Sequence, residues 1–240
     1  MSTLWVVATP IGNLQDLTPR SVEALASADF WLVEDTRISG KLQSHLGLRK
    51  PMKLLNEHTT DAQIDRHLES IEQADSVAIL TDAGTPGISD PGARLIDRAY
   101  DQGILVDAAP GASAVTTALA LSGFFAQQFA FLGFLGRKAG DLRSSLEPFT
   151  DSTLTLVLFE SPHRFLKTLE GVAHVLGERR YAICRELTKS HQQVYRDTLP
   201  QLPSPTQVPS KGEFTLVIEG KRRKKMSEKV DSNQNFEGMV

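Results

Sequence analysis

The sequence predicts an α/β protein with a mostly parallel N-terminal sheet and a mixed C-terminal sheet. In the first half, short apolar and β-branched runs alternate with segments of helical periodicity, which is the spacing of βαβ units. In the second half, two strand-like runs follow each other with no helix between them, which indicates a mixed sheet. The change of pattern near residue 122 predicts two domains.

The elements of the first half are predicted from their own patterns. Thr18 is a suitable N-cap with Pro19 at the first helical position, and Gly47 is a suitable helix stop. We expect strands at 4–8, 30–33, 53–55, 77–80 and 104–108, and helices at 18–26, 39–46, 61–72, 91–102 and 112–121.

The second half contains fewer helical patterns. We expect strands at 129–132, 154–159, 180–185, 192–198 and 213–219, and helices at 140–147 and 162–176, the last stopped by Gly177. The predicted domains are an N-terminal α/β domain over 1–122 and a C-terminal α/β domain over 123–220. The polar segment 221–240 is expected to be disordered.

Composition excludes several classes of protein. The 240 residues are 40% hydrophobic and 23% charged, which suits a globular chain, and the net charge of -3 excludes a basic footprint over the whole chain. Cys184 is the only cysteine, so an intrachain disulfide is impossible. The histidines lack close metal-ligand spacing, and we expect no metal. We expect a soluble cytoplasmic protein, since the sequence shows neither a signal peptide nor an apolar run of membrane-spanning length.

Three turns rich in glycine and proline follow strands of the first half. They are "ATPIGN" (8–13), "TDAGTPGISDPG" (81–92) and "APGASA" (109–114). One such turn is most simply a tight connection, but three at the carboxyl edge of one parallel sheet favour a ligand site. The turns contain no lysine, and no dinucleotide or P-loop motif is present, so a cationic or neutral polar ligand is favoured over a triphosphate.

Eight motifs together resemble the tetrapyrrole methylase superfamily and, within it, the ribosomal RNA cytidine 2'-O-methyltransferases. In chain order they are "VVATPIGNLQDLTPRSVEAL", "VEDTRISGKL", "NEH", "LTDAGTPGISDPG", "GFLGRK", "FESPHR", "RELTK" and "GEFTLVIEG". The resemblance implies a two-domain tetrapyrrole-methylase-like fold with S-adenosylmethionine (SAM) in the cleft between the domains. The implied SAM contacts are Pro10, Asp82, Gly84, Ile88, Ser113, Ala114, Leu187 and Thr215.

The resemblance also implies an acceptor and a partner. The acceptor is the ribose hydroxyl of a cytidine in the decoding region of 16S rRNA in the small ribosomal subunit, and the enzyme is expected to be a homodimer. Long cationic side chains in polar loops or at helix starts are expected to contact RNA phosphates. Other polar side chains are expected to activate the ribose hydroxyl. The RNA-binding candidates are Arg37, Lys138 and Arg164, and the catalytic candidates are Glu160, Glu186 and Lys189.

Three other interpretations of these features stay open. Glu34–Arg37 and Glu186–Lys189 are alternatively ion pairs that hold the domains together. The whole chain is alternatively a tetrapyrrole methylase acting on uroporphyrinogen or a precorrin, or a catalytically silent SAM-binding factor in ribosome assembly. Gln192 and Gln193, which stand where the resembling family has an acidic pair, motivate the silent alternative.

Overall fold

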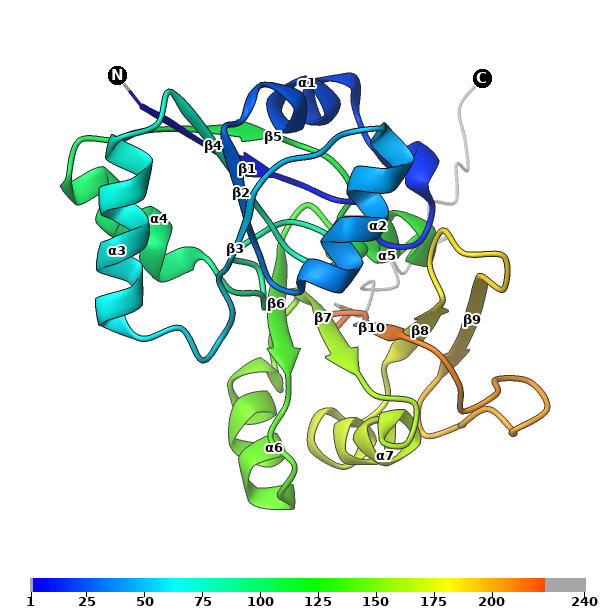
Figure 1. Cartoon of the computed structure of the whole chain (residues 1–240). Coiled ribbons are helices and arrows are strands. Elements are labelled where there is room, and N and C mark those ends of the chain that lie inside the picture. The colour runs from blue at the N-terminus through cyan, green and yellow to red at the C-terminus, as the bar shows by residue number, and fades with distance from the viewer. Residues whose placement is uncertain (1, 223–240) are drawn as a thin grey trace, which may run out of the picture.

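Two five-stranded sheets make up the protein in the computed structural model, which describes residues 2–222 (Figure 1). The first sheet contains β1 (Thr3–Val7), β2 (Phe30–Val33), β3 (Met52–Leu54), β4 (Ser76–Leu80) and β5 (Leu105–Ala109). Its order is β3-β2-β4-β1-β5, and every neighbouring pair is parallel. The carboxyl ends of β4, β1 and β5 are therefore neighbours at one edge.

Helices cover both faces of the first sheet. The covering helices are α1 (Pro19–Ser27), α2 (Thr36–Leu46), α3 (Asp61–Glu72) and α4 (Ala93–Asp101). Within β2, Phe30 and Leu32 pack with the α3 and α4 side chains, whereas Trp31 and Val33 pack with those of α1 and α2. Successive side chains of a strand point to opposite faces, so a strand covered on both faces is apolar throughout.

The second sheet is mixed. It contains β6 (Phe129–Phe134), β7 (Thr155–Glu160), β8 (Arg180–Arg185), β9 (Gln193–Thr198) and β10 (Phe214–Ile218). The order is β6-β7-β10-β8-β9, with β6 and β7 parallel and the other pairs antiparallel. The helices α6 (Ala139–Leu146) and α7 (Phe165–Leu176) pack on one face, at the end of the molecule away from the first sheet (Figure 1). The fold class predicted from the sequence is confirmed.

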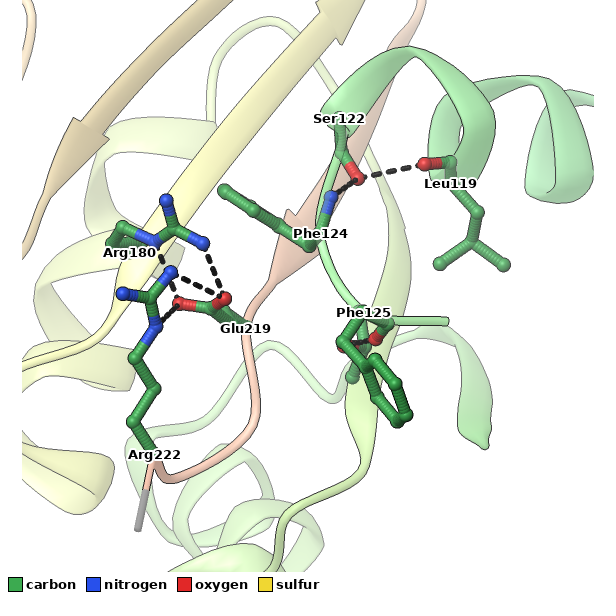
Figure 2. A network of polar contacts seen from close by, with 8 residues as sticks. Leu119, Ser122, Phe124, Phe125, Arg180, Glu219 and Arg222 are labelled. Carbon is green, nitrogen blue, oxygen red and sulfur yellow. Dashed lines mark hydrogen bonds and ion pairs between the residues drawn. The ribbon is translucent and has the colours of Figure 1, made fainter. Parts of the chain in front are cut away.

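Helix α5 (Ala114–Ser122) connects the two sheets and covers the other face of the second one. It ends at Gly123 in the left-handed conformation, and Ser122 Oγ donates to Leu119 O at 2.8 Å and accepts from Phe124 N at 3.1 Å (Figure 2). The predicted boundary at 122 coincides with this helix end and stays a prediction, because α5 itself packs against the second sheet.

A buried carboxylate anchors the chain after β10. Glu219 accepts from Arg180 and from Arg222, and the Arg180 guanidinium lies 4.8 Å from the centre of the Phe124 ring (Figure 2). These contacts tie the end of the second sheet to the connection after α5. Beyond residue 222 the predicted disordered segment lies outside the described residues.

Several helix starts differ from the predictions for local reasons. Helix α2 begins three residues earlier than expected, because the Asp35 side chain accepts from Arg37 N at 2.7 Å and caps it. Helix α4 begins at Ala93 instead of residue 91, since Gly92 has φ 122° and lies outside the helical region. Two short 3₁₀ helices, Leu14–Asp16 and Glu147–Phe149, were not predicted. In residues 2–222 no helix combines the length and the apolar character needed to cross a membrane.

Candidate functional site

The three predicted turns meet at the carboxyl edge of the first sheet. The turn after β1 pairs with the turn after β4, because Thr9 N donates to Gly84 O at 2.8 Å and Gly84 N donates to Thr9 O at 3.1 Å. Thr9 Oγ1 also donates to Thr81 O at 3.1 Å. Thr85 Oγ1 lies 3.4 Å from Ala112 O, which joins the turn after β4 to the turn after β5. The convergence predicted from the sequence is confirmed.

The turns form one wall of a cavity between the two halves, which we call the cleft cavity; its volume is about 380 Å³. The first half contributes Ile11, residues 83–85, 88–90 and 113–115. The second half contributes Phe134 from β6, residues 159–162 at the end of β7, and residues 212–215 at the start of β10. A cavity of this size and mixed lining is typical of small-ligand sites.

Charge in the cleft cavity has one sign. Among residues 2–222 its ionisable lining residues are Asp90, Glu160 and Glu213, and neither lysine nor arginine lines it. Its hydroxyl groups come from Thr85, Ser89, Ser113, Ser161 and Thr215. Such a lining stabilises a positively charged ligand and disfavours a phosphate.

Five of the eight predicted cofactor residues line the cleft cavity: Gly84, Ile88, Ser113, Ala114 and Thr215. Gly84 has φ 87°, a conformation that other residues rarely adopt, so glycine is needed where this turn forms the wall. Leu187 lines a small adjoining cavity that shares Ala114 and Thr215 with the larger one. Ile88 lines the cleft cavity and Leu187 the adjoining one.

The other two predicted cofactor residues, Pro10 and Asp82, line a separate cavity of about 230 Å³. Asp82 Oδ1 is buried and has no hydrogen-bond partner in the described part of the chain. Burial, together with the charges of Glu34 and Asp35, raises the pKa of Asp82. An acceptor atom without a partner is available to a donor or cation that binds there.

Glu160, a predicted catalytic residue, is held by several groups at the edge of the cleft cavity. It is 3% exposed, accepts from Ser161 N at 2.7 Å and from Thr168 Oγ1 at 2.6 Å, and lies 3.3 Å from Arg164 Nη2. Arg164 in turn donates to Leu135 O at 2.9 Å. Both carboxylate oxygens of Glu160 are engaged, which fixes the loop where α7 begins.

The other two predicted catalytic residues, Glu186 and Lys189, form the ion pair that the sequence analysis kept as an alternative. Lys189 Nζ lies 3.0 Å from Glu186 Oε1 and 3.0 Å from Glu213 Oε2. The hydrogen bond from Glu213 N lowers the pKa of Glu186, and Lys189 lowers it further. The segment lies against Gly12, where an added Cβ would come 2.9 Å from Leu187 O. The pair thus lies where the two halves touch.

A second concave surface, which we call the basic groove, lies between α6 and α7, with a volume of about 570 Å³. Its cationic lining residues are Arg137, Lys138, Arg143, Arg164 and Lys167, with Glu170 as the acidic one. The groove begins at Gly136 and Arg164, two residues beyond the Phe134 and Pro162 that line the cleft cavity. The predicted RNA contacts Lys138 and Arg164 therefore lie together, beside the cleft.

Arg37, the third predicted RNA contact, lies apart from the basic groove. Its side chain is 87% exposed, at the start of α2, and pairs with Asp35. The alternative pair with Glu34 is not formed. The RNA role of Arg37 stays a prediction.

Asp90 and Phe134 are two of the cleft residues that the sequence analysis did not single out. Asp90 lines the cleft cavity, and burial together with the charge of Glu34 raises its pKa to about 6. Phe134 is 61% exposed at the cavity mouth, because a register shift between Phe131 and Phe134, with Gly133 at φ 59°, turns the end of β6. Asp90 is visible in the "SDPG" motif, but its contacts with distant residues are not.

Metal ligands do not gather in the described structure. Within residues 2–222 no group of three or more histidine, cysteine, aspartate or glutamate side chains is placed to hold a metal ion. The expectation that the protein needs no metal stays a prediction.

Comparison with known families gives a match over most of the chain. The family described as tetrapyrrole (corrin/porphyrin) methylases matches residues 3–203. Proteins named ribosomal RNA small subunit methyltransferase I are also similar. That of Haemophilus influenzae is 40% identical over 235 residues, covering 95% of this chain and 82% of the relative. That of Thermotoga maritima is 39% identical over 222 residues, covering 92% of this chain and all of the relative.

Solved structures share the fold at low sequence identity. The methyltransferase CobJ superimposes with a TM-score of 0.66 at 18% identity, covering 93% of this chain and 97% of that one. The uroporphyrin-III-C-methyltransferase from Thermus thermophilus gives 0.62 at 19% identity, with coverages of 91% and 94%. At this identity the likeness shows the arrangement of the two sheets and carries nothing about substrate.

Proposed function

Because this chain belongs to the tetrapyrrole methylase family, and within it to the ribosomal RNA small subunit methyltransferase I proteins, we propose that it methylates the ribose 2'-hydroxyl of a cytidine in 16S rRNA. It is a SAM-dependent methyltransferase that acts on ribosomal RNA. That the target is a cytidine, and that it lies in the decoding region, are the more specific parts of this proposal. The observation that carries it is the anionic cleft cavity beside the basic groove.

The residues of the cleft cavity fit SAM. When bound, SAM supplies an electrophilic methyl group on a positively charged sulfur. Carboxylates and hydroxyl groups without lysine or arginine suit that charge. Gly84, Ser113, Ala114 and Thr215 would hold SAM against the turns, and Ile88 would cover an apolar part. The unpartnered Asp82 Oδ1 is an acceptor close to the same turn.

The basic groove fits an RNA strand leading to the cleft. Arg137, Lys138 and Lys167 are exposed and have no carboxylate within ion-pair distance in the described residues. Free cations of this kind bind phosphates and release counterions. The groove would position the strand, and the cleft would receive the target ribose, so that positioning contributes to the rate.

Incubation with labelled SAM tests the proposed function. The acceptors are small ribosomal subunits that lack the modification and, separately, uroporphyrinogen. Label in the RNA, located by nuclease digestion and mass spectrometry to the ribose of one cytidine, is the expected result. Label only in the porphyrinoid would support a tetrapyrrole methylase. SAM binding by calorimetry without transfer to either acceptor would support a silent assembly factor.

The partner and the location belong to the same proposal. The partner is the assembling small subunit, in the cytoplasm, and the enzyme works as a homodimer. Leu121 in the last turn of α5, Phe125 in the connection after it and Phe129 at the start of β6 are exposed, and apolar side chains of this kind suit contact with a second copy. Sedimentation of the full chain should show a dimer, and a monomer at micromolar concentration would contradict it.

A further inference from the structure

A ribose hydroxyl must lose its proton when it attacks a methyl group, and the structure indicates which side chain accepts it. This inference rests on the proposed function and adds the missing base. The candidates are the carboxylates of the cleft cavity, since neither histidine nor lysine lines it in the described part of the chain. They differ in how many of their oxygens remain free.

Glu160 and Glu213 are already engaged. Both oxygens of Glu160 accept short hydrogen bonds from Ser161 N and Thr168 Oγ1. Glu213 extends into solvent, 75% exposed, with Oε2 3.0 Å from Lys189 Nζ. Glu160 therefore has no oxygen without a hydrogen bond, and Glu213 is a solvent-exposed carboxylate whose charge is paired with Lys189.

Asp90 accepts no short hydrogen bond and forms no ion pair within the described residues. Its only hydrogen bond within the described residues is a long one, 3.4 Å from Thr81 Oγ1 to Oδ2. The residue lines the cleft cavity and also a second cavity of about 440 Å³, bordered by Asn56, Glu57 and Thr59. Asp90 therefore lies in the partition between the place for the methyl donor and a polar space large enough for part of a nucleotide.

The backbone holds Asp90 in that partition. The preceding residue, Ser89, has φ 58°, which is unusual for a residue with a side chain. Across the cleft, a Cβ added to Gly133 would come 2.9 Å from Ser89 Oγ, so the loop is packed against the end of β6. The loop that carries Asp90 is thus held by contacts from both halves.

The electrostatic surroundings make Asp90 a base of suitable strength. Burial, the charge of Glu34 from the end of β2, and that of Asp82 from its own loop raise its pKa to about 6 despite the bond from Thr81. The other charged groups lining its two cavities are Glu57, Arg94, Glu160 and Glu213, and Arg94 is paired with Asp61. A base is most effective when its pKa lies close to the working pH.

We propose that Asp90 is the catalytic residue that accepts the proton of the ribose 2'-hydroxyl. The O–H bond breaks and its proton passes to an oxygen of Asp90. The electron pair left on the ribose oxygen forms the new bond to the methyl carbon, while the carbon–sulfur bond breaks and its pair stays on sulfur. Asp90 then returns the proton to water.

Asp90→Asn tests this proposal, with Asp101→Asn on the exposed end of α4 as the matched control. With RNA and SAM saturating, Asp90→Asn should lower kcat by about 100- to 10,000-fold. Below about pH 6 the wild-type rate should fall about tenfold per pH unit, and the residual rate of the variant should lack this limb. Asp101→Asn should keep the wild-type rate and profile.

Two measurements without turnover accompany the kinetics. Carbon NMR of the free enzyme should show a carboxyl titrating near pH 6 that Asp90→Asn removes and that SAM shifts downward. Because the pKa of Asp90 is raised by folding, its charge destabilises the fold as pH rises from about 4 to about 6. Asp90→Asn should therefore melt higher than wild type at pH 8.

The outcomes separate this proposal from the proposed function. Wild-type protein that binds SAM but methylates no RNA overturns both. An active wild type with an equally active Asp90→Asn variant overturns only the role of Asp90. A melting temperature of Asp90→Asn below that of wild type at pH 8, with a proportional loss of SAM binding, assigns the carboxylate a structural role and also overturns it.

Discussion

The cleft cavity and the basic groove are neighbours with opposite charge. The ionisable residues of the cleft cavity are three carboxylates, whereas the groove between α6 and α7 carries five lysine or arginine side chains and one glutamate. The groove begins two residues beyond the end of β6 and four residues beyond the end of β7, the two strand ends that close the cleft. Charge therefore changes sign within a few residues on the same two loops.

This difference assigns a ligand to each surface. A cationic methyl donor is stabilised among carboxylates, and a polyanionic acceptor is stabilised among free cations. If both ligands bound to one surface, one of them would meet charges of its own sign. The net charge of -3 does not reveal this arrangement, because the opposite charges of the two surfaces partly cancel in the sum over the chain.

Filling the cleft cavity should have the largest effect. Ala114→Trp places a large side chain where the first turn of α5 borders the cavity, and we expect at least about a 100-fold loss of SAM affinity, or about 2.7 kcal/mol. Ala120→Trp on the exposed side of the same helix is the control and should bind normally. Calorimetry with SAM measures both, and unchanged binding by Ala114→Trp would place the donor elsewhere.

Reversing charge in the basic groove should have the next largest effect and should leave the cleft intact. Arg137→Glu with Lys138→Glu is expected to raise KM for the small subunit at least about tenfold and to reduce the salt dependence of binding by ~1 per lost phosphate contact. SAM affinity should not change.

Arg49→Glu with Arg66→Glu alters net charge equally, at exposed sites outside the groove, and is the control. If the control raised KM as much as the groove variant, the effect would come from total charge, and the distinction between the two surfaces would fail.

The last expected effect is on stability and not on ligand binding, and it concerns the contact that keeps the two surfaces together. In Gly12→Ala the new Cβ meets Lys189 and Leu187 across the two halves, and we expect a loss of about 1–3 kcal/mol of stability. Gly40→Ala, inside α2 with nothing near its added Cβ, should instead stabilise by about 1 kcal/mol. Denaturant unfolding compares them, and equal stability of the two variants would contradict a packed contact at Gly12.

The regular elements were predictable because their signals are local. The bounds of β2, α3 and β8 agree with those expected from the sequence. The caps at Thr18, Gly47 and Gly177 lie where single residue types favour them. The helix starts that differed depend on a side chain or a glycine conformation, such as those of Asp35 and Gly92, that the sequence does not specify alone.

The part of the site that is built from the ends of neighbouring parallel strands was predictable from the sequence. The three turns meet because β4, β1 and β5 are neighbours, an inference available from the order of elements. The role of Asp90 was hidden, because its pKa is raised by burial in the folded chain and by the charge of Glu34, 56 positions away in the sequence. Phe134 was hidden because a register shift between strands turns it outward.

Photo-crosslinking of the enzyme with labelled SAM and the small subunit, followed by peptide mass spectrometry, tests the separation of the two ligands most directly. We predict SAM adducts on peptides containing residues 83–90, 113–115 or 212–215, and RNA adducts on peptides containing 137–143 or 164–175. RNA adducts confined to other surfaces, or SAM adducts on the α6–α7 peptides, would contradict the account.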